Sequence, residues 1–378
     1  MRTPVLRYVL LPALLVAGAA AAAPPPRFPA AAVWHQRIDA APLHVDSASM
    51  IATLQGLGGW GPAGGVNGRM HIDFSFHVAR ASAAAPSYEV VPHKEYDDYY
   101  LPDCEPPGTR MPVPAGAAFE GEDGLSCDNG SADCHLLVVQ DTLLYELYSG
   151  DLADGDDAGI EPELDALCLA VWDLAAVYPG EGRGEHCTSA DGAGFPIAPL
   201  LPNADGVAAA LQQPDDDLGH AIRFILPNPR IASDASLGGV GGRLYVRPAS
   251  HAGGPNGPSS TVPYGARLRL RADFPMSGYN AAAQVLLRTM QRYGIVLSDG
   301  GNIALTFESD RHTDTTWSAL GIEPQTFWNG DGGSTPVAAT DFEVLDTGPR
   351  IGETWECVRS AVVPGEALLI DGFEGDPP

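Results

Sequence analysis

The chain has 378 residues and a formal charge of −27, with 48 acidic residues against 21 lysines and arginines. Such an excess of negative charge argues against nucleic acids and anionic membrane surfaces as partners. The 44 glycines and 34 prolines favour a loop-rich, mostly β protein.

The N-terminal segment has the pattern of an export signal. Arg2 and Arg7 precede an apolar run that ends in alanines and three prolines. This predicts a secretory signal peptide over residues 1–23, a short linker over 24–34 and a secreted or periplasmic location. No later apolar stretch is long enough to cross a membrane, so we expect no membrane association after the signal is removed.

The first half of the exported chain contains a predicted helix and a predicted strand. The segment SASMIATLQGL, residues 47–57, predicts a short helix capped by Ser47 or Ser49. Residues 69–80 alternate apolar and polar side chains, which predicts a half-buried strand with His71, Asp73, Ser75 and His77 on its polar face.

Six cysteines lie downstream of the signal, and residues 92–134 hold three of them among many prolines, glycines and aspartates. An even number of cysteines in an oxidising compartment predicts up to three disulfides, whose pairing the sequence leaves open. We therefore expect 92–134 to be a long excursion pinned by disulfides.

A hairpin is predicted directly after this excursion. Strands 135–140 and 143–148 flank a two-residue turn, which places Leu137 opposite Glu146 and puts His135, Glu146 and Tyr148 on one face. Because the other face is apolar and can form the core, we expect the polar face to turn toward a cleft. The alternative is an ordinary hydrogen-bonded set of cross-strand side chains.

The last third has a more regular pattern. Strands are predicted over 220–226, 243–249, 266–274 and 341–346, a helix over 280–293, and a second hairpin over 295–309 with its turn at 299–302. Segment 168–177 fits a strand or a helix. Together these elements predict a mainly β fold, a β-sandwich or related sheet architecture, with few helices and long disulfide-pinned loops. It would form a single domain over 35–358, followed by a C-terminal tail over 359–378.

Several segments carry a resemblance to a known family. They are HLLVVQ followed by LLYELY, AVWDL, TSADGAGFPI, HAIRFILP, VPYGARLRLRADF and RYGIVLSDGGN. In this order they resemble a family of secreted, mostly uncharacterised bacterial proteins. The LLIDGFEGDPP end is similar to the D-G-F-E tails of exported proteobacterial proteins. The resemblance implies export and a shared fold, and it carries no activity.

Our first hypothesis is a secreted glycoside hydrolase that acts on an extracellular polysaccharide. Such enzymes need two carboxyl groups beside the scissile bond, and burial raises a carboxyl pKa toward the range of a general acid. Trp172 is a candidate stacking surface for a sugar. The candidate catalytic residues, chosen for their apolar or glycine-rich surroundings or as proton-sharing partners, are Asp73, His135, Glu146, Asp173, Asp191 and His220.

A near rival is a polysaccharide lyase acting on uronates. Arg267, Arg269 and Arg271 alternate with leucines on one predicted strand, and guanidinium groups bind carboxylates in a two-pronged fashion. The alternative is that these arginines neutralise the acidic surface of the protein itself. For a lyase the candidate bases are Tyr264, Tyr293, His220 and His251.

Two further possibilities stay open. Asp151, Asp154, Asp156 and Asp157 lie in an acidic loop whose oxygen atoms suit a structural Ca²⁺, although a solvated turn has the same composition. No other cofactor is expected. The second class of function is a non-catalytic β-sandwich that binds glycans or proteins through its loops.

Overall fold

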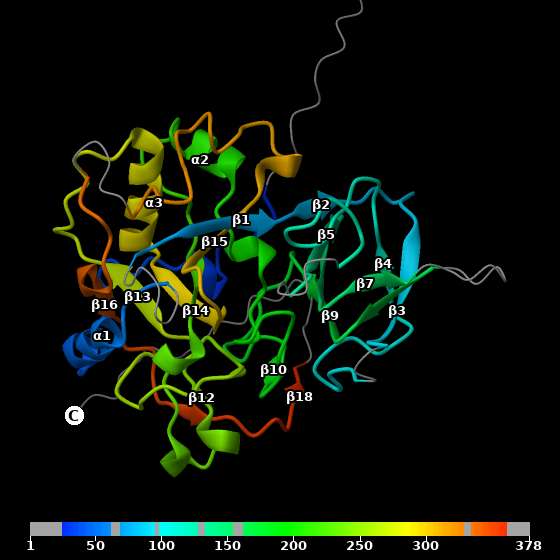
Figure 1. The fold of residues 1–378 in the computed structure, drawn as a ribbon, viewed down its shortest axis with the longest axis horizontal. Coiled ribbons are helices and arrows are strands. Elements are labelled where there is room, and N and C mark those ends of the chain that lie inside the picture. The colour runs from blue at the N-terminus through cyan, green and yellow to red at the C-terminus, as the bar shows by residue number, and fades with distance from the viewer. Residues whose placement is uncertain are drawn as a thin grey trace, which may run out of the picture.

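The computed structural model describes residues 25–61, 69–94, 98–127, 133–153, 162–328 and 334–360. The predicted signal peptide and residues 361–378 of the predicted tail lie outside the described residues. Most of the described regular structure is β, which confirms the mainly β prediction (Figure 1). The α-helices of the described part are α1 (Ser47–Gly56), α2 (Ala204–Ala210) and α3 (Ala281–Arg292).

The largest sheet has six strands in the order β1-β15-β11-β14-β13-β16. β1 and β15 are parallel, as are β11 and β14, whereas the other neighbouring pairs are antiparallel. The strands are β1 (Ile72–Phe76), β11 (Ile222–Leu226), β13 (Arg267–Leu270), β14 (Ile295–Gly300), β15 (Leu305–Glu308) and β16 (Phe342–Val344).

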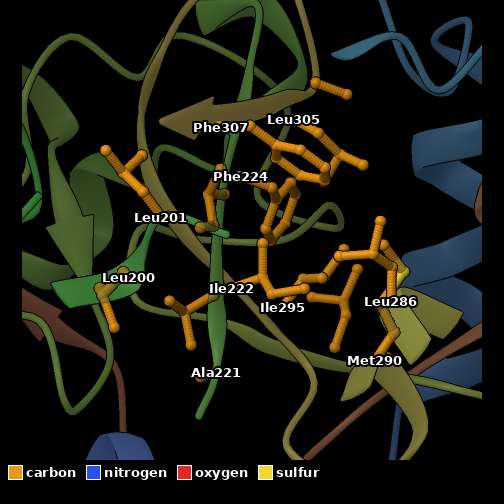
Figure 2. Close-up of a cluster of buried hydrophobic side chains, with 14 of the residues drawn as sticks. Leu200, Leu201, Ala221, Ile222, Phe224, Leu286, Met290, Ile295, Leu305 and Phe307 are labelled. Atoms are coloured by element: carbon orange, nitrogen blue, oxygen red, sulfur yellow. The ribbon is translucent and has the colours of Figure 1, made fainter. Parts of the chain in front are cut away.

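The main hydrophobic core lies between this sheet and α3. Leu286 and Met290 of α3 point toward Ile222, Phe224 and Ile295 of the sheet (Figure 2). All five are fully buried. The Asn280 side chain caps α3 by accepting a hydrogen bond from Ala283 N at 2.8 Å, and Gly294 follows the helix with a positive φ of 76°. The helix predicted over 280–293 is therefore confirmed.

Two four-stranded sheets pack face to face beside the large sheet. Their orders are β2-β5-β6-β9 and β4-β3-β8-β7, and Val90, Met111, Val138, Leu147 and Leu164 fill the space between them. The strands are β2 (Val78–Arg80), β3 (Ser87–Pro92), β4 (Arg110–Pro112), β5 (Leu136–Gln140), β6 (Leu143–Tyr148), β7 (Asp151–Ala153), β8 (Glu163–Ala166) and β9 (Cys168–Asp173). Segment 168–177 is thus a strand followed by a turn.

The strand predicted over 69–80 is divided between two sheets. β1 belongs to the large sheet and β2 to a four-stranded one, and β2 continues from the end of β1 toward the smaller sheets on the right of Figure 1. His77 lies between them, where its ring nitrogens contact Ser309 Oγ at 2.6 Å and Glu122 O at 3.1 Å. Through these two contacts, the residue between β1 and β2 is held by the segment after β15 and by the loop that contains Glu122.

The predicted hairpin over 135–148 is confirmed in its register. Leu137 pairs with Glu146, and Asp141 in the turn has a positive φ of 53°. Both faces of this sheet are buried, however, because Leu137 and Leu144 join the main core while Val138 and Leu147 join the smaller one. The polar face is therefore not turned toward solvent as a whole.

Two local predictions are wrong. β14 and β15 do not form a hairpin, because β11 is inserted between them. Helix α1 begins at Ser47 after Asp46, and Ser47 does not cap it, because its hydroxyl instead accepts a hydrogen bond from Val344 N at 2.8 Å.

The three predicted disulfides are confirmed as Cys104–Cys168, Cys127–Cys134 and Cys187–Cys357. The last one links the two strands of one small ribbon in the lower part of Figure 1, since Cys187 follows Glu185 by two residues and Cys357 precedes Val358. Among the described residues, no helix has the length and apolar character needed to cross a membrane. The ribbons pair β10 (Gly184–Glu185) with β18 (Val358–Arg359), and β12 (Leu244–Tyr245) with β17 (Ile351–Gly352).

Candidate active site

A pocket of about 670 Å³ lies where the end of β14 meets the sheet of β5 and β6. Each disulfide has a cysteine close to its wall, since Asp103, Asp133 and Thr188 precede or follow a half-cystine. The lining residues are Asp98, Tyr99, Tyr100, Leu101, Asp103, Asp133, Tyr148, Thr188, Ser189, Ala190, Asp191, Gly192, Arg243, His251, Gly253, Gly254, Asp299 and Trp355.

Two aspartates of the pocket, Asp191 and Asp299, form a carboxyl pair. Their side chains are close enough for each to shift the pKa of the other, and Gly192 N donates to Asp299 Oδ2 at 3.0 Å. A Cβ at position 192 would lie 2.4 Å from Asp299 Oδ1, so only glycine allows this approach. The loop is held further by Gly194 N, which donates to Asp191 O at 2.8 Å.

We infer that the pair shares a proton. Asp191 Oδ1 accepts a hydrogen bond from Arg223 Nη2 at 2.8 Å, whereas the buried Asp191 Oδ2 has no N–H donor among the described residues. Two carboxyl groups this close to each other cannot both ionise readily, which favours one proton on the pair. Because Arg223 stabilises the charge on Asp191, we assign the proton to Asp299.

The pKa values agree with this assignment. Burial and the neighbouring Asp191 raise the pKa of Asp299 to about 7. Burial also raises the pKa of Asp191, but Arg223 opposes that shift. When the environments of two neighbouring acidic groups differ in this way, one group acts as a proton donor and the other stays a carboxylate. Here Asp299 is the donor and Asp191 is the carboxylate.

Asp133 is a third carboxyl group of the pocket. Its side chain is exposed, and no described residue donates a hydrogen bond to it. Burial around it raises its pKa, while the nearby His135 cation acts in the opposite direction. Cys134, the next residue, closes the short disulfide with Cys127 and so holds Asp133 in place.

His135 lies beside the pocket as a fixed cation. Its Nδ1 binds Glu120 Oε2 at 2.7 Å and its Nε2 binds Ala190 O at 2.8 Å, so both nitrogens donate. Although burial opposes it, Glu120 raises the pKa of His135 to about 9. Ser75 Oγ lies 2.9 Å from Asp73 Oδ2 and 3.1 Å from Glu120 Oε1 and can donate its one hydrogen to either of them, which links Asp73 to this network.

His251 lines the pocket in its neutral form. Burial lowers its pKa to about 4, and its Nδ1 contacts Gly192 O at 2.8 Å. Since a carbonyl oxygen only accepts, Nδ1 carries the hydrogen and Nε2 has a lone pair. Tyr264 lies behind Gly253, a residue of the pocket lining. A Cβ at position 253 would lie 2.8 Å from the Tyr264 hydroxyl oxygen.

The structure therefore brings together only part of the predicted site. Asp191 and His251 line the pocket, and His135 and Tyr264 lie directly behind its wall. Of the predicted carboxylates, Asp191 lines the pocket, whereas Asp73, Glu146 and Asp173 do not. Among the predicted residues, those that do not line the pocket are Asp73, His135, Glu146, Trp172, Asp173, His220, Tyr264, Tyr293, Arg267, Arg269 and Arg271.

Glu146 is a buried hydrogen-bond acceptor. Its Oε1 accepts from Ile197 N at 2.8 Å and Ala198 N at 2.9 Å, and its Oε2 accepts from Trp172 Nε1 at 3.0 Å. Glu146 is 0% exposed and Trp172 is 2% exposed, so neither reaches a ligand in the pocket. Together they fasten the 197–198 segment to β6 and β9.

Asp173 and His220 also have local partners. Asp173 accepts a hydrogen bond from Ala175 N at 2.9 Å at the end of β9. His220 is fully buried and its Nδ1 contacts Ala221 O at 2.7 Å. Burial lowers its pKa well below the usual value, so His220 is neutral within the core.

The arginines of β13 bind the N-terminal segment of the chain. Arg267 donates to Tyr293 O, Val33 O and Gln36 O at 2.8, 3.1 and 2.9 Å. Arg269 binds Glu343 and the carbonyl oxygens of residues 38, 39 and 41. Arg269 also lines a second pocket of about 530 Å³, but its guanidinium group is paired there with Glu343 at 2.9 Å. Arg267 and Arg269, which we considered for uronate binding, therefore hold residues 33–41 in place.

The Arg267→Gln variant is expected to lower the free energy of unfolding by about 3 kcal/mol, because buried carbonyl oxygens lose their donors. Arg271→Gln is the matched control. Arg271 pairs with Asp273 at the surface, so its loss should change stability by less than about 0.5 kcal/mol. Chemical denaturation of both variants under oxidising conditions measures the difference, and equal effects would contradict this role for Arg267.

Asp299 was missed because it was assigned to a hairpin turn. A signal was present, since SADGAG at 189–194 and SDGGN at 298–302 each place an aspartate before glycine. The possible Ca²⁺ loop is outside the described residues at Asp154, Asp156 and Asp157, while Asp151 Oδ1 accepts a hydrogen bond from Cys127 N at 3.2 Å. Within the described ranges, no cluster of His, Cys, Asp or Glu is arranged for a metal ion.

Comparison of the chain with protein-family models, curated proteins and solved structures found no match. The function proposed below therefore rests on the geometry of the pocket.

Proposed function

We propose that the protein is a secreted glycoside hydrolase whose active site is the acidic pocket. The observation that supports this proposal is the Asp191–Asp299 pair, two neighbouring carboxyl groups of the pocket lining that favour one shared proton. Tyr100, Tyr148 and Trp355 add aromatic faces of the kind on which sugar rings pack.

In the proposed reaction Asp299 is the general acid. It donates its proton to the glycosidic oxygen as the bond from that oxygen to the anomeric carbon breaks. Water forms the new bond to the anomeric carbon, and a carboxylate takes the proton that this water releases. Asp133 suits this second role because it is a pocket carboxylate to which no described residue donates a hydrogen bond.

The charge of the pocket favours hydrolysis of a non-anionic glycan over the lyase alternative. Five aspartates and a single arginine line it, and a uronate would meet this negative field. The arginines first considered for uronate binding have other partners. The non-catalytic binding alternative uses the same pocket and differs in the absence of turnover.

The test is a reducing-end assay of the purified protein against neutral, amine-bearing and uronate polysaccharides, with absorbance at the unsaturated-uronate wavelength followed in parallel. We expect new reducing ends without new absorbance, and their loss in Asp299→Asn. Asp173→Asn is the control, because Asp173 is a carboxylate outside the pocket. Absorbance that rises with the reducing ends would replace the hydrolase by a lyase, and binding without products would replace it by a binding module.

A second candidate is peptide hydrolysis. Two neighbouring aspartates that share one proton are also the arrangement by which aspartic peptidases activate water. Casein in the same panel distinguishes the two functions. Peptide products that disappear in Asp299→Asn, with no activity on any glycan, would support this candidate.

A further inference from the structure

One wall of the pocket is formed by the loop of residues 98–103. The loop is fixed at its end by the Cys104–Cys168 disulfide and by Tyr99, whose hydroxyl donates to Glu105 O at 2.6 Å. It is therefore a fixed wall of the pocket. Its lining residues are Asp98, Tyr99, Tyr100, Leu101 and Asp103.

This loop combines carboxylates with aromatic rings. Asp98 and Asp103 flank two tyrosines, and the ring of Tyr100 lies 6.2 Å from that of Tyr148 across the wall. Aromatic faces beside carboxylates are the surroundings that attract an ammonium group, through the ring quadrupole and through charge. A carboxylate or sulfate would be repelled at the same place.

The remainder of the pocket does not offset this charge. Arg243 is the lining cation, and it is stacked over the exposed Trp355 ring at 4.7 Å. His251 is neutral because burial lowers its pKa to about 4. Asp191 is already paired with the buried Arg223, whereas Asp98, Asp103 and Asp133 form no ion pair with a described residue, so three unpaired aspartates of the lining lie beside one arginine.

The Asp191 side chain shows that the pocket is more than an acidic surface. Asp191 is 1% exposed, and its Oδ2 has no N–H donor among the described residues. A buried polar oxygen that lines a pocket and lacks such a donor is typical of a site built to bind or to react. The acidic loop thus borders a constructed site.

We propose that the pocket selects a saccharide that carries a free amine, with Asp98 and Asp103 facing the ammonium group. This inference rests on the proposed function for its choice of a saccharide, and on the loop for its choice of an amine. Asp98 is exposed, and its Oδ1 accepts a hydrogen bond from the adjacent Tyr99 N at 2.8 Å. No residue of the described ranges donates a hydrogen bond to its other oxygen.

Calorimetric titration tests the proposal. The probes are a β-1,4-linked glucosamine pentamer and its fully N-acetylated counterpart, at a mildly acidic pH where the amine is charged and in a buffer of low salt. We expect the amine-bearing pentamer to bind about tenfold more tightly, and the preference to weaken as salt is added. Equal affinities, or a preference for the acetylated pentamer, would overturn the proposal.

A pair of double variants separates the pocket from the overall charge of the protein. Asp98→Asn/Asp103→Asn should remove most of the preference, and it keeps an oxygen to accept the hydrogen bond from Thr188 N, which is 2.8 Å from Asp103 Oδ2. Asp141→Asn/Asp173→Asn removes the same charge outside the pocket. An equal loss of preference in both double variants would assign it to the net charge and overturn the proposal.

Binding and turnover distinguish the two proposals. Selective binding of the amine without hydrolysis would support this inference and contradict the proposed reaction. Hydrolysis of neutral glycans without amine selectivity would support the reaction and contradict the inference. If a lysine-rich peptide binds through Asp98 and Asp103 while neither pentamer does, the choice of a saccharide is wrong.

Discussion

The Asp299→Asn variant is expected to lose about 10²–10⁴-fold in kcat, the usual contribution of a general acid. The asparagine oxygen can still accept from Gly192 N, which lies 3.0 Å from Asp299 Oδ2, while its amide nitrogen replaces Oδ1, the acceptor for Gly300 N at 2.7 Å. The amide group can donate a hydrogen bond to Asp191 but cannot release a proton to a leaving group. Initial rates on the best glycan of the panel, with circular dichroism as the check of folding, measure the effect.

The pH dependence of the wild-type enzyme follows from the same group. Burial and Asp191 raise the pKa of Asp299 to about 7. The reaction needs the proton on Asp299. The rate should therefore be highest below pH values of about 7 and should fall on the alkaline side, as the pH rises through about 7. A rate that instead increases above this pH would contradict the role of Asp299 as the acid.

The Asp191→Asn variant is expected to move this alkaline limb toward lower pH. The neutral amide removes one of the two causes that hold the pKa of Asp299 up, and Arg223 then favours ionised Asp299 more strongly. Because Arg223 also loses its buried partner, this variant should be less stable, and its pH profile is measured only where it is folded. An unchanged profile would show that the two carboxyls are not coupled.

Local patterns were enough to predict several elements. The alternation on both strands and the two-residue turn specify the Leu137–Glu146 register, since a slip by one residue would invert both faces. The apolar spacing of α3 and its Asn280 cap likewise depend only on neighbouring residues. The order of the strands in the six-stranded sheet could not be predicted in this way, because β11, which precedes β14 and β15 in the sequence by about seventy residues or more, lies between them.

The candidate site was only partly predictable, because the partners of its residues are distant in the sequence. Glu146 is covered by Ile197 and Ala198, some fifty residues away, so its side of the hairpin is core. Arg267 reaches carbonyl oxygens more than two hundred residues upstream. Asp191 was found from its glycine-rich setting, whereas the same setting at Asp299 was attributed to a turn.

The Glu146→Ala variant is expected to lower the free energy of unfolding by about 3–5 kcal/mol, one of the largest single-residue effects in the chain. The carboxylate accepts hydrogen bonds from Ile197 N, Ala198 N and Trp172 Nε1. Alanine leaves these three buried donors without a partner. Glu146→Gln is the matched variant. Its single amide oxygen can serve both backbone donors and its amide nitrogen faces the Trp172 donor, so it should lose less.

The comparison of wild type with Glu146→Gln at two pH values separates the charge from the hydrogen bonds. Burial raises the pKa of Glu146 to about 7, whereas in the unfolded chain a glutamate titrates near about 4.3. A raised pKa means that the stability contributed by this group is fully present below the unfolded value and is lost as the pH rises through about 7. The glutamine does not titrate, so the advantage of wild type over Glu146→Gln should be larger at pH values near about 5 than near about 8, by on the order of 2 kcal/mol. Urea denaturation at both pH values measures this difference. An advantage that grows with pH would mean that the N–H donors, rather than burial, control the ionisation of Glu146.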